Sequence, residues 1–244
     1  MFVSVKLLNE EMGVDLSLAR FFVDRKVPSN NAFWKKRFLY IGRANGFISI
    51  PVYYDILRRI GVPVKALLDE QHVLFMEQLM HYAILHEKKE ISFFQQLEKI
   101  NEMLAGRIRD QSFYEELLNY LTQPALYPRG RLGRNFKTLN RADVFLYVLC
   151  DLPLESRMLD DAIRYWYAMH PSYLIYDDIY DYEKDKSDGE ENVVMELGGG
   201  NLGLERAISI LAQNAEVLKE INPALSDSIY LHIEDIREKE IKFE

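Results

Sequence analysis

The sequence has little of what marks a secreted or membrane-spanning protein. It holds 1 cysteine, Cys150, among 244 residues, so no internal disulfide can form, which is typical of proteins from a reducing cytoplasm. The N-terminal residues, with Lys6 followed by Glu10 and Glu11, make a poor signal peptide. No uninterrupted apolar run approaches the length of a membrane span. We therefore expect a cytoplasmic protein without a transmembrane segment.

Basic charge and strand-like patterns are also scarce. The 30 basic residues are outnumbered by 38 acidic ones, for a net charge of −8, which disfavours a nucleic-acid-binding protein because phosphate contacts need a dominant basic face. No segment shows the period-two alternation of a strand, and no internal repeat is visible. The length suits one large core. The sequence predicts a single all-α domain over residues 1–244, and a homodimer is compatible with it.

Helical periodicity recurs along most of the chain and is separated by short polar breaks. A proline at position 171 lies inside one of these segments, where it should kink or break the helix. The predicted helices cover residues 14–24, 52–60, 64–87, 91–104, 112–121, 140–150, 156–182, 202–221 and 225–239.

An acidic segment, Tyr176 to Asn192, follows the apolar and aromatic part of the helix predicted over 156–182. Asp177, Asp181 and Asp185 would stack on one helix face with Asp178 beside them, and like charges at this spacing repel. A divalent cation reverses that effect, because Mg²⁺ is held by a few carboxylates with water and substrate phosphate. The alternative is a solvated acidic helix end. The apolar residues before the segment favour a Mg²⁺ site.

A loop rich in glycine and arginine, Gln123 to Thr138, precedes these helices. It carries Arg131, Arg134 and Lys137, and such side chains bind phosphate oxygens. Diphosphate chemistry needs metal ions on one side of the phosphate and cationic groups on the other. The loop and the acidic segment together therefore predict a diphosphate site. Aromatic residues between Tyr165 and Tyr180 either form core or line an apolar pocket beside it.

The stretch DDIYDYEKDKSDGEEN resembles the second metal motif of class I terpene synthases. Asp177, Asp178, Asp181, Lys184 and Asp185 fall on its positions, and the following residues continue it in the usual style. The first two and Asp181 also match the second DDxxD motif of trans-prenyl diphosphate synthases, a related all-α fold. The resemblance extends from about residue 129 to residue 192.

The resemblance implies roles for several basic residues. Arg131 stands 46 positions before Asp177, where the terpene synthases have an arginine that senses diphosphate, and Arg134 is close by. Lys137 and Thr138 stand where prenyl diphosphate synthases have a Lys-Thr pair. In the N-terminal half, Asp69 and Glu70 are the nearest candidate for a degenerate first metal motif.

The fold implied is a helical bundle of the class I isoprenoid synthase type, and the implied cofactor is Mg²⁺. Asp177, Asp181 and Asp185 would bind the ions that hold an isoprenyl diphosphate, while Arg131, with Arg134 or Lys137, stabilises the departing pyrophosphate. The predicted reaction is ionisation followed by cyclisation, elimination or water capture. Two alternatives are a chain-elongating prenyl diphosphate synthase and a non-catalytic subunit that binds prenyl diphosphate.

Overall fold

Helices form the whole regular structure of the part of the chain that can be described. The computed structural model describes residues 3–26, 30–31, 45–123 and 130–239, and within these ranges it contains helices and no strand. The all-α prediction is confirmed for these residues. None of the helices described there combines the length and apolar character needed to cross a bilayer.

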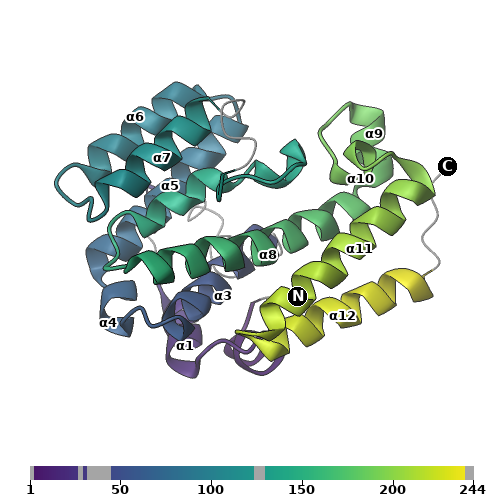
Figure 1. Ribbon diagram of the computed structural model, residues 1–244, viewed down its shortest axis with the longest axis horizontal. Helices are drawn as coiled ribbons and strands as arrows, with labels where there is room; N and C mark the ends of the chain where they lie inside the picture. The colour runs from purple at the N-terminus through teal and green to yellow at the C-terminus, as the bar shows by residue number, and fades with distance from the viewer. Residues whose placement is uncertain (1–2, 27–29, 32–44, 124–129, 240–244) are drawn as a thin grey trace.

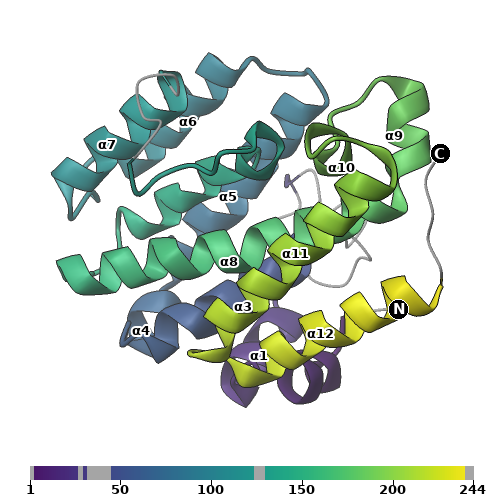
Figure 2. The same cartoon turned by 45° about the vertical axis from the view of Figure 1, so that its right-hand side comes forward.

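The helix that organises the fold is α8, Ser156–Tyr180. It crosses the middle of the molecule and packs against α3, Asn45–Arg59, and α11, Gly200–Lys219 (Figures 1 and 2). All its side chains from Tyr165 to Tyr173 are buried. A helix that is apolar and aromatic on all sides belongs in a core, and this one is enclosed by neighbours from both halves of the chain.

The remaining helices lie around α8. Helices α5 to α7 lie on one side, α11 pairs with α12 on another, and α9 and α10 lie at the C-terminal end of α8 (Figure 1). The bounds are η1 Leu7–Glu11, α1 Leu16–Asp24, α4 Val64–Leu67, α5 Glu70–Glu87, α6 Phe93–Leu104, α7 Gln111–Thr122, η4 Lys137–Asn140, η5 Asp143–Leu149, α9 Tyr182–Asp188, α10 Val193–Glu196 and α12 Pro223–Glu238.

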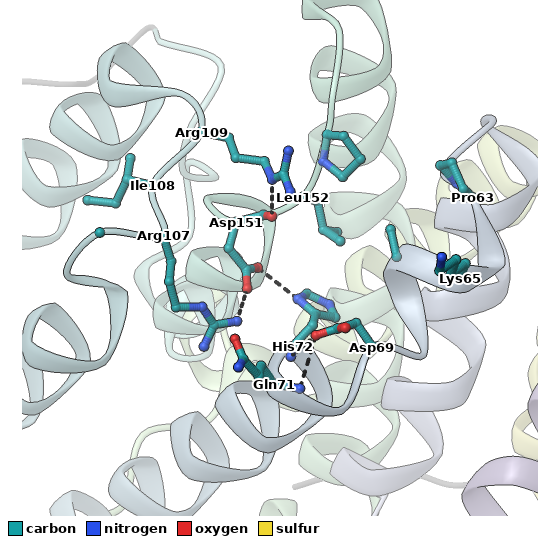
Figure 3. A pocket seen from close by; sticks show the side chains of 13 residues that line it. Pro63, Lys65, Asp69, Gln71, His72, Arg107, Ile108, Arg109, Asp151 and Leu152 are labelled. Atoms are coloured by element: carbon teal, nitrogen blue, oxygen red, sulfur yellow. Dashed lines mark hydrogen bonds and ion pairs between the residues drawn. The ribbon is translucent and has the colours of Figure 1, made fainter.

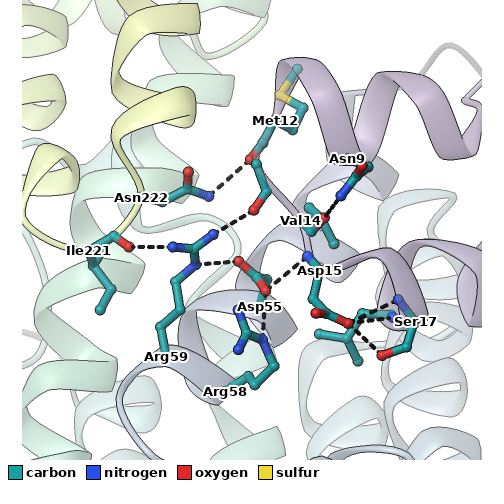
Figure 4. A network of polar contacts seen from close by, with 12 residues as sticks. Asn9, Met12, Val14, Asp15, Ser17, Asp55, Arg58, Arg59, Ile221 and Asn222 are labelled. Carbon is teal, nitrogen blue, oxygen red and sulfur yellow. Dashed lines mark hydrogen bonds and ion pairs between the residues drawn. The ribbon is translucent and has the colours of Figure 1, made fainter.

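A buried carboxylate ties the N-terminal segment to the rest of the structure (Figure 4). Asp55 on α3 is fully buried and accepts hydrogen bonds from Arg58 at 2.9 Å, from Arg59 at 2.5 Å and from the Asp15 amide at 3.1 Å. Arg59 in turn donates to the carbonyls of Gly13 and Ile221. The network fixes α1, α3 and the α11–α12 turn to one another, and its arginines satisfy the buried charge.

The predicted helix over residues 64–87 is divided into α4 and α5. The Asp69 carboxylate accepts from the amides of Gln71 at 3.0 Å and His72 at 3.3 Å, so it is the N-cap of a new helix. Capping by aspartate satisfies amides that have no partner inside the helix. The single-helix prediction was wrong because a periodic pattern does not show where a side chain replaces a backbone acceptor.

Pro171 does not break the helix, since α8 continues through it. Pro171 has no N–H, so the carbonyl of Tyr167, four residues earlier, loses its usual donor. The Arg134 guanidinium donates to that carbonyl at 2.8 Å and lies over the Tyr167 ring, 5.1 Å from its centroid. A side chain from a distant loop therefore replaces the missing helical hydrogen bond.

The segment predicted as an α-helix over residues 140–150 instead begins at the last residue of the 3₁₀ helix η4 and continues as a second 3₁₀ helix, η5. Its backbone bonds join residues three apart, as from Phe145 to Ala142 at 2.9 Å. Short 3₁₀ pieces are common as connectors. Here they place Arg141 and Asp143 against α8.

Candidate functional site at the acidic end of α8

Three of the predicted metal-binding aspartates do lie on successive helical turns. The Asp181 amide donates to the Asp177 carbonyl at 2.9 Å, and the Asp185 amide donates to the Asp181 carbonyl at 2.8 Å. The hydrogen-bond ladder thus passes from α8 into α9 with Asp181 at the junction. The three aspartates, spaced four residues apart in the sequence, therefore lie on one face of the helical segment, although their side chains have different surroundings.

Asp178 and Asp185 are buried and bonded to protein groups. Asp178 is 2% exposed; it forms an ion pair with Arg141 at 2.8 Å and accepts from the Val193 amide at 2.6 Å. Asn192 donates to the Asp178 carbonyl at 2.6 Å and to the Asp185 carboxylate at 2.9 Å. These bonds close the loop between α9 and α10 against α8, so both carboxylates hold the end of the helix together.

Asp177 and Asp181 are exposed, and neither carboxylate has a hydrogen-bond or ion-pair partner among the described residues. The pKa of Asp177 is raised, first by partial burial and then by the negative charge of Asp181, while Arg141 opposes the increase. Each carboxylate therefore disfavours the charge of the other. Two such groups one turn apart are free to bind a cation.

Lys137 and Thr138 lie beside this acidic end. The amides of both residues donate to the Glu196 carboxylate on α10, at 2.8 and 3.0 Å. The Lys137 ammonium is exposed and pairs with Glu191 at 2.7 Å. Lys184 is exposed on α9 and makes no ion pair within the described ranges. The Lys-Thr pair is thus anchored next to the motif, with its ammonium on the surface.

Arg131 lies far from the aspartates. Its guanidinium pairs with Glu116 and with Asp160, both at 2.6 Å, and lies over the Phe113 ring. Asp160 precedes Asp177 by 17 residues of continuous helix, which corresponds to about 25 Å. The structure therefore separates Arg131 from the acidic end. Arg134, bonded to the Tyr167 carbonyl, is likewise committed to α8 two to three turns before the motif.

Asp69 and Glu70, the candidate first metal motif, are also engaged. Asp69 caps α5, and Glu70 pairs with Arg25 at 2.9 Å. Arg25 also pairs with the fully buried Glu77 at 2.6 Å. These bonds give both acidic side chains a role in folding, and neither is directed to the acidic end of α8 by any contact described.

Arg141 and His170 are two residues near the motif that the sequence reasoning did not select. Arg141 is the charge partner of Asp178. His170, two turns before Asp177, stacks on Trp166 at 4.5 Å between ring centroids. Neither of its ring nitrogens has a hydrogen-bond partner in the part of the chain that the structure describes, and burial, with Arg141 nearby, lowers its pKa to about 3. No spacing rule would have identified either residue, since their importance comes from what packs around them.

The available side chains fit a Mg²⁺ ion that is held by only two protein carboxylates. Among the described residues no group of three or more His, Cys, Asp and Glu side chains converges as a metal site. Mg²⁺ is commonly held by one or two carboxylates, with water and substrate phosphate completing its octahedron. Asp177 and Asp181 supply that number. The fit is therefore to an ion bound with its substrate and not to a site made by protein groups alone.

The fold and this site define an all-α protein with a pair of free carboxylates at the end of its central helix. Comparisons with protein-family models, with curated proteins and with solved structures gave no match to this chain. The functional argument therefore depends on the geometry of the chain itself.

Proposed function

We propose that the protein is a Mg²⁺-dependent enzyme of the class I terpene synthase type that ionises an isoprenyl diphosphate. The observation that carries the proposal is the pair Asp177 and Asp181, one helical turn apart, exposed, mutually repelling and without a protein partner in the described ranges. Carboxylates kept in this state cost stability unless a cation binds them. The neighbouring cations Arg141 and Lys137 suit a ligand that is itself anionic.

In this proposal Asp177 and Asp181 hold the metal, which would supply positive charge to the leaving diphosphate. Arg141 would donate to diphosphate oxygens, in the role that the resemblance to terpene synthases implies for Arg131. It is about one-third exposed and uses one face of its guanidinium for Asp178, so N–H groups are left for a ligand. Trp166 and Tyr173 are buried, so the half-exposed Tyr180 is an aromatic residue of α8 that would contact an apolar chain at this end.

The test is Mg²⁺-dependent release of pyrophosphate from geranyl or farnesyl diphosphate. We expect release by the wild type and a loss of at least 100-fold, about 3 kcal/mol in the activation free energy, in Asp177→Asn/Asp181→Asn. Arg131→Gln is the matched control and should retain the rate, because Arg131 contacts Glu116 and Asp160. Adding isopentenyl diphosphate separates two outcomes: a longer diphosphate means chain elongation, and a hydrocarbon or alcohol means a terpene synthase. No release from any chain length would overturn the enzymatic proposal.

A second candidate is a non-catalytic protein that binds prenyl diphosphate with Mg²⁺. It is favoured by the engagement of Asp69 and Glu70 in capping and ion pairing, which leaves the acidic end of α8 as one metal motif without a partner motif. Titration calorimetry with a non-hydrolysable farnesyl diphosphate analogue distinguishes it. Binding that requires Mg²⁺ and Asp181, without turnover of the parent substrate, would support this candidate; absence of Mg²⁺-dependent binding would exclude both.

A further inference from the structure

A pocket of about 630 Å³ lies at the opposite end of α8 from the aspartates. Its walls are the α4–α5 turn, the α6–α7 turn and the residues just before α8 (Figure 3). Pockets of 300 to 1,000 Å³ are typical of small-molecule sites. Since Asp177 lies 21 residues beyond the first residue of α8, this pocket is about 30 Å from the acidic end and is independent of the proposed function.

A chain of buried polar groups forms the floor of the pocket. The Tyr54 hydroxyl lies 2.9 Å from Nε2 of His72, and Nδ1 of His72 lies 2.7 Å from the Asp151 carboxylate. Both ring nitrogens of His72 therefore have a hydrogen-bond partner. The second Asp151 oxygen accepts from Arg107, which lies over the Phe75 ring at 5.4 Å. His72 and Asp151 side chains are only 3% and 5% exposed.

This series of hydrogen bonds joins four separate parts of the fold and holds Arg107 in place. Tyr54 comes from α3, His72 from α5, Asp151 from the residues before α8, and Arg107 from the α6–α7 turn. Such preorganised groups lose little freedom when a ligand binds. The pocket is therefore a built site and not a gap between side chains.

Positive charge in the pocket is left over once the internal bonds are assigned. The lining holds three cations, Lys65, Arg107 and Arg109, against two carboxylates. Asp151 is bonded to His72 and Arg107, and Asp69 caps α5 while keeping its negative charge. The Arg109 backbone amide donates to the Cys150 carbonyl, and its Nε donates to the Asp151 carbonyl at 2.9 Å. Its terminal nitrogens have no acceptor among the described residues. Lys65 makes no ion pair among the described residues. One more cation than carboxylate in the lining, in a protein of net charge −8, favours an anionic ligand.

We propose that this pocket binds the phosphoryl group of a small phosphorylated molecule through Lys65 and Arg109, with Arg107 adding to the positive field. A phosphate monoester carries nearly two negative charges near neutral pH and accepts several hydrogen bonds, which matches an arginine fork and an ammonium. The organic part of the ligand would contact Pro63, Ile108 and Leu152, which also line the pocket.

The experiment is a titration of the intact protein with inorganic phosphate and with glycerol 3-phosphate, followed by calorimetry and ³¹P NMR in EDTA. The chelator removes divalent cations, so the acidic end of α8 contributes no metal-dependent binding. We expect saturable binding of both probes. Lys65→Gln and Arg109→Gln should each weaken it about tenfold, because each removes one charge-assisted contact.

Two controls keep the result specific. Lys219→Gln, at an exposed lysine in the last turn of α11, and Asp177→Asn/Asp181→Asn should leave phosphate affinity unchanged. Urea unfolding of Lys65→Gln should match the wild type, since the exposed Lys65 ammonium makes no hydrogen bond or ion pair with the described residues. The proposal would be overturned if the wild type bound neither the soluble probes nor the vesicles described below, or if Lys65→Gln and Arg109→Gln both kept the affinity of the wild type. Neither result bears on Mg²⁺-dependent pyrophosphate release.

The source of the phosphoryl group is resolved by a second arm with vesicles. Sedimentation with phosphatidic acid vesicles, compared with phosphatidylcholine vesicles, tests a lipid headgroup. Binding that is lost in Lys65→Gln/Arg109→Gln would identify a lipid phosphate as the ligand. Binding of the soluble probes alone would identify a free metabolite. Either result supports phosphoryl recognition, and failure of both probes and vesicles contradicts it.

Discussion

Charged side chains along the middle of α8 have partners in the protein, whereas Asp177 and Asp181 at its C-terminal end have none among the described residues. Along the middle, each charged side chain brought by residues 131–143 has a partner: Arg131 pairs with Glu116 and Asp160, Arg134 donates to the Tyr167 carbonyl, and Asp143 accepts from three aromatic side chains. In the last turn Asp177 and Asp181 have no such partners in the described ranges. Folding accounts for the first set of charges, and we propose that the second set binds a ligand.

The largest test of this contrast compares adjacent aspartates. Asp178→Ala should lower the free energy of unfolding by about 3 kcal/mol, because it leaves the Arg141 guanidinium and the buried Val193 amide without their acceptor. Asp177→Ala should cost nothing measurable in the absence of Mg²⁺. Urea unfolding monitored by circular dichroism gives both values. Equal losses in the two variants would remove the distinction between structural and free aspartates.

A pH titration sharpens the contrast at Asp143, whose carboxylate accepts from Tyr120 at 2.6 Å, Tyr167 at 2.7 Å and Trp166 at 3.2 Å. Burial raises its pKa from 3.8 to about 6 despite these bonds. In the unfolded chain Asp143 loses its proton near pH 3.8, whereas in the folded protein it keeps the proton up to about pH 6. Its contribution to the free energy of unfolding is therefore complete below pH 3.8 and is lost as the pH rises to about 6. The change amounts to about 3 kcal/mol.

The readout is the slope of unfolding free energy against pH from 4 to 6, for the wild type and for Asp143→Asn. Asparagine keeps the size of the side chain and cannot ionise, so the downward slope should be flatter in the variant. Taking the difference between the two proteins removes the contributions of other titrating groups. Identical slopes would show that Asp143 does not titrate in this interval.

A double-mutant cycle tests the replacement of a helical hydrogen bond by a side chain. Arg134→Ala should lower stability by about 1 to 2 kcal/mol, since it leaves the Tyr167 carbonyl without a donor. In a Pro171→Ala background the alanine N–H supplies that donor, so the same change should cost less. Thermal unfolding of the four proteins yields the coupling energy. A coupling of zero would mean that Arg134 acts only by stacking on Tyr167.

The smallest effect concerns the free carboxylates. Without Mg²⁺, Asp181→Asn should raise the free energy of unfolding by about 0.3 to 0.5 kcal/mol, because it removes repulsion one turn from Asp177. With millimolar Mg²⁺, the wild type should gain stability and the variant should not. Paired thermal melts at both conditions provide the comparison. A loss of stability on removing the charge would contradict the proposed repulsion.

Much of the helix pattern was predictable, and the errors have definite causes. The boundaries of α6, α7, α11 and α12 agree with the periodic segments to within two residues, since each has a single apolar face. The division at Asp69 and the passage of α8 through Pro171 were not predictable. Both depend on a side chain that supplies a hydrogen bond missing from the backbone. A pattern of apolar residues does not predict such a bond.

For the candidate site, sequence spacing placed Asp177, Asp181 and Asp185 on one face, because helical geometry relates residues four apart wherever the helix lies. It could not show that Asp178 would pair with Arg141 or that Asp185 would accept a hydrogen bond from Asn192. Nor could it place Arg131, whose distance of 46 residues in sequence says nothing about direction in space.

The sequence by itself determined the class of fold and the stacking of the acidic residues, since both follow from short-range periodicity. Only the tertiary structure decided which charges are neutralised inside the protein and which remain for a ligand. That choice depends on contacts between residues distant in the chain, such as Arg141 with Asp178 or Asp151 with His72. The energy of a charge is set by what surrounds it, and packing assembles those surroundings from the whole chain.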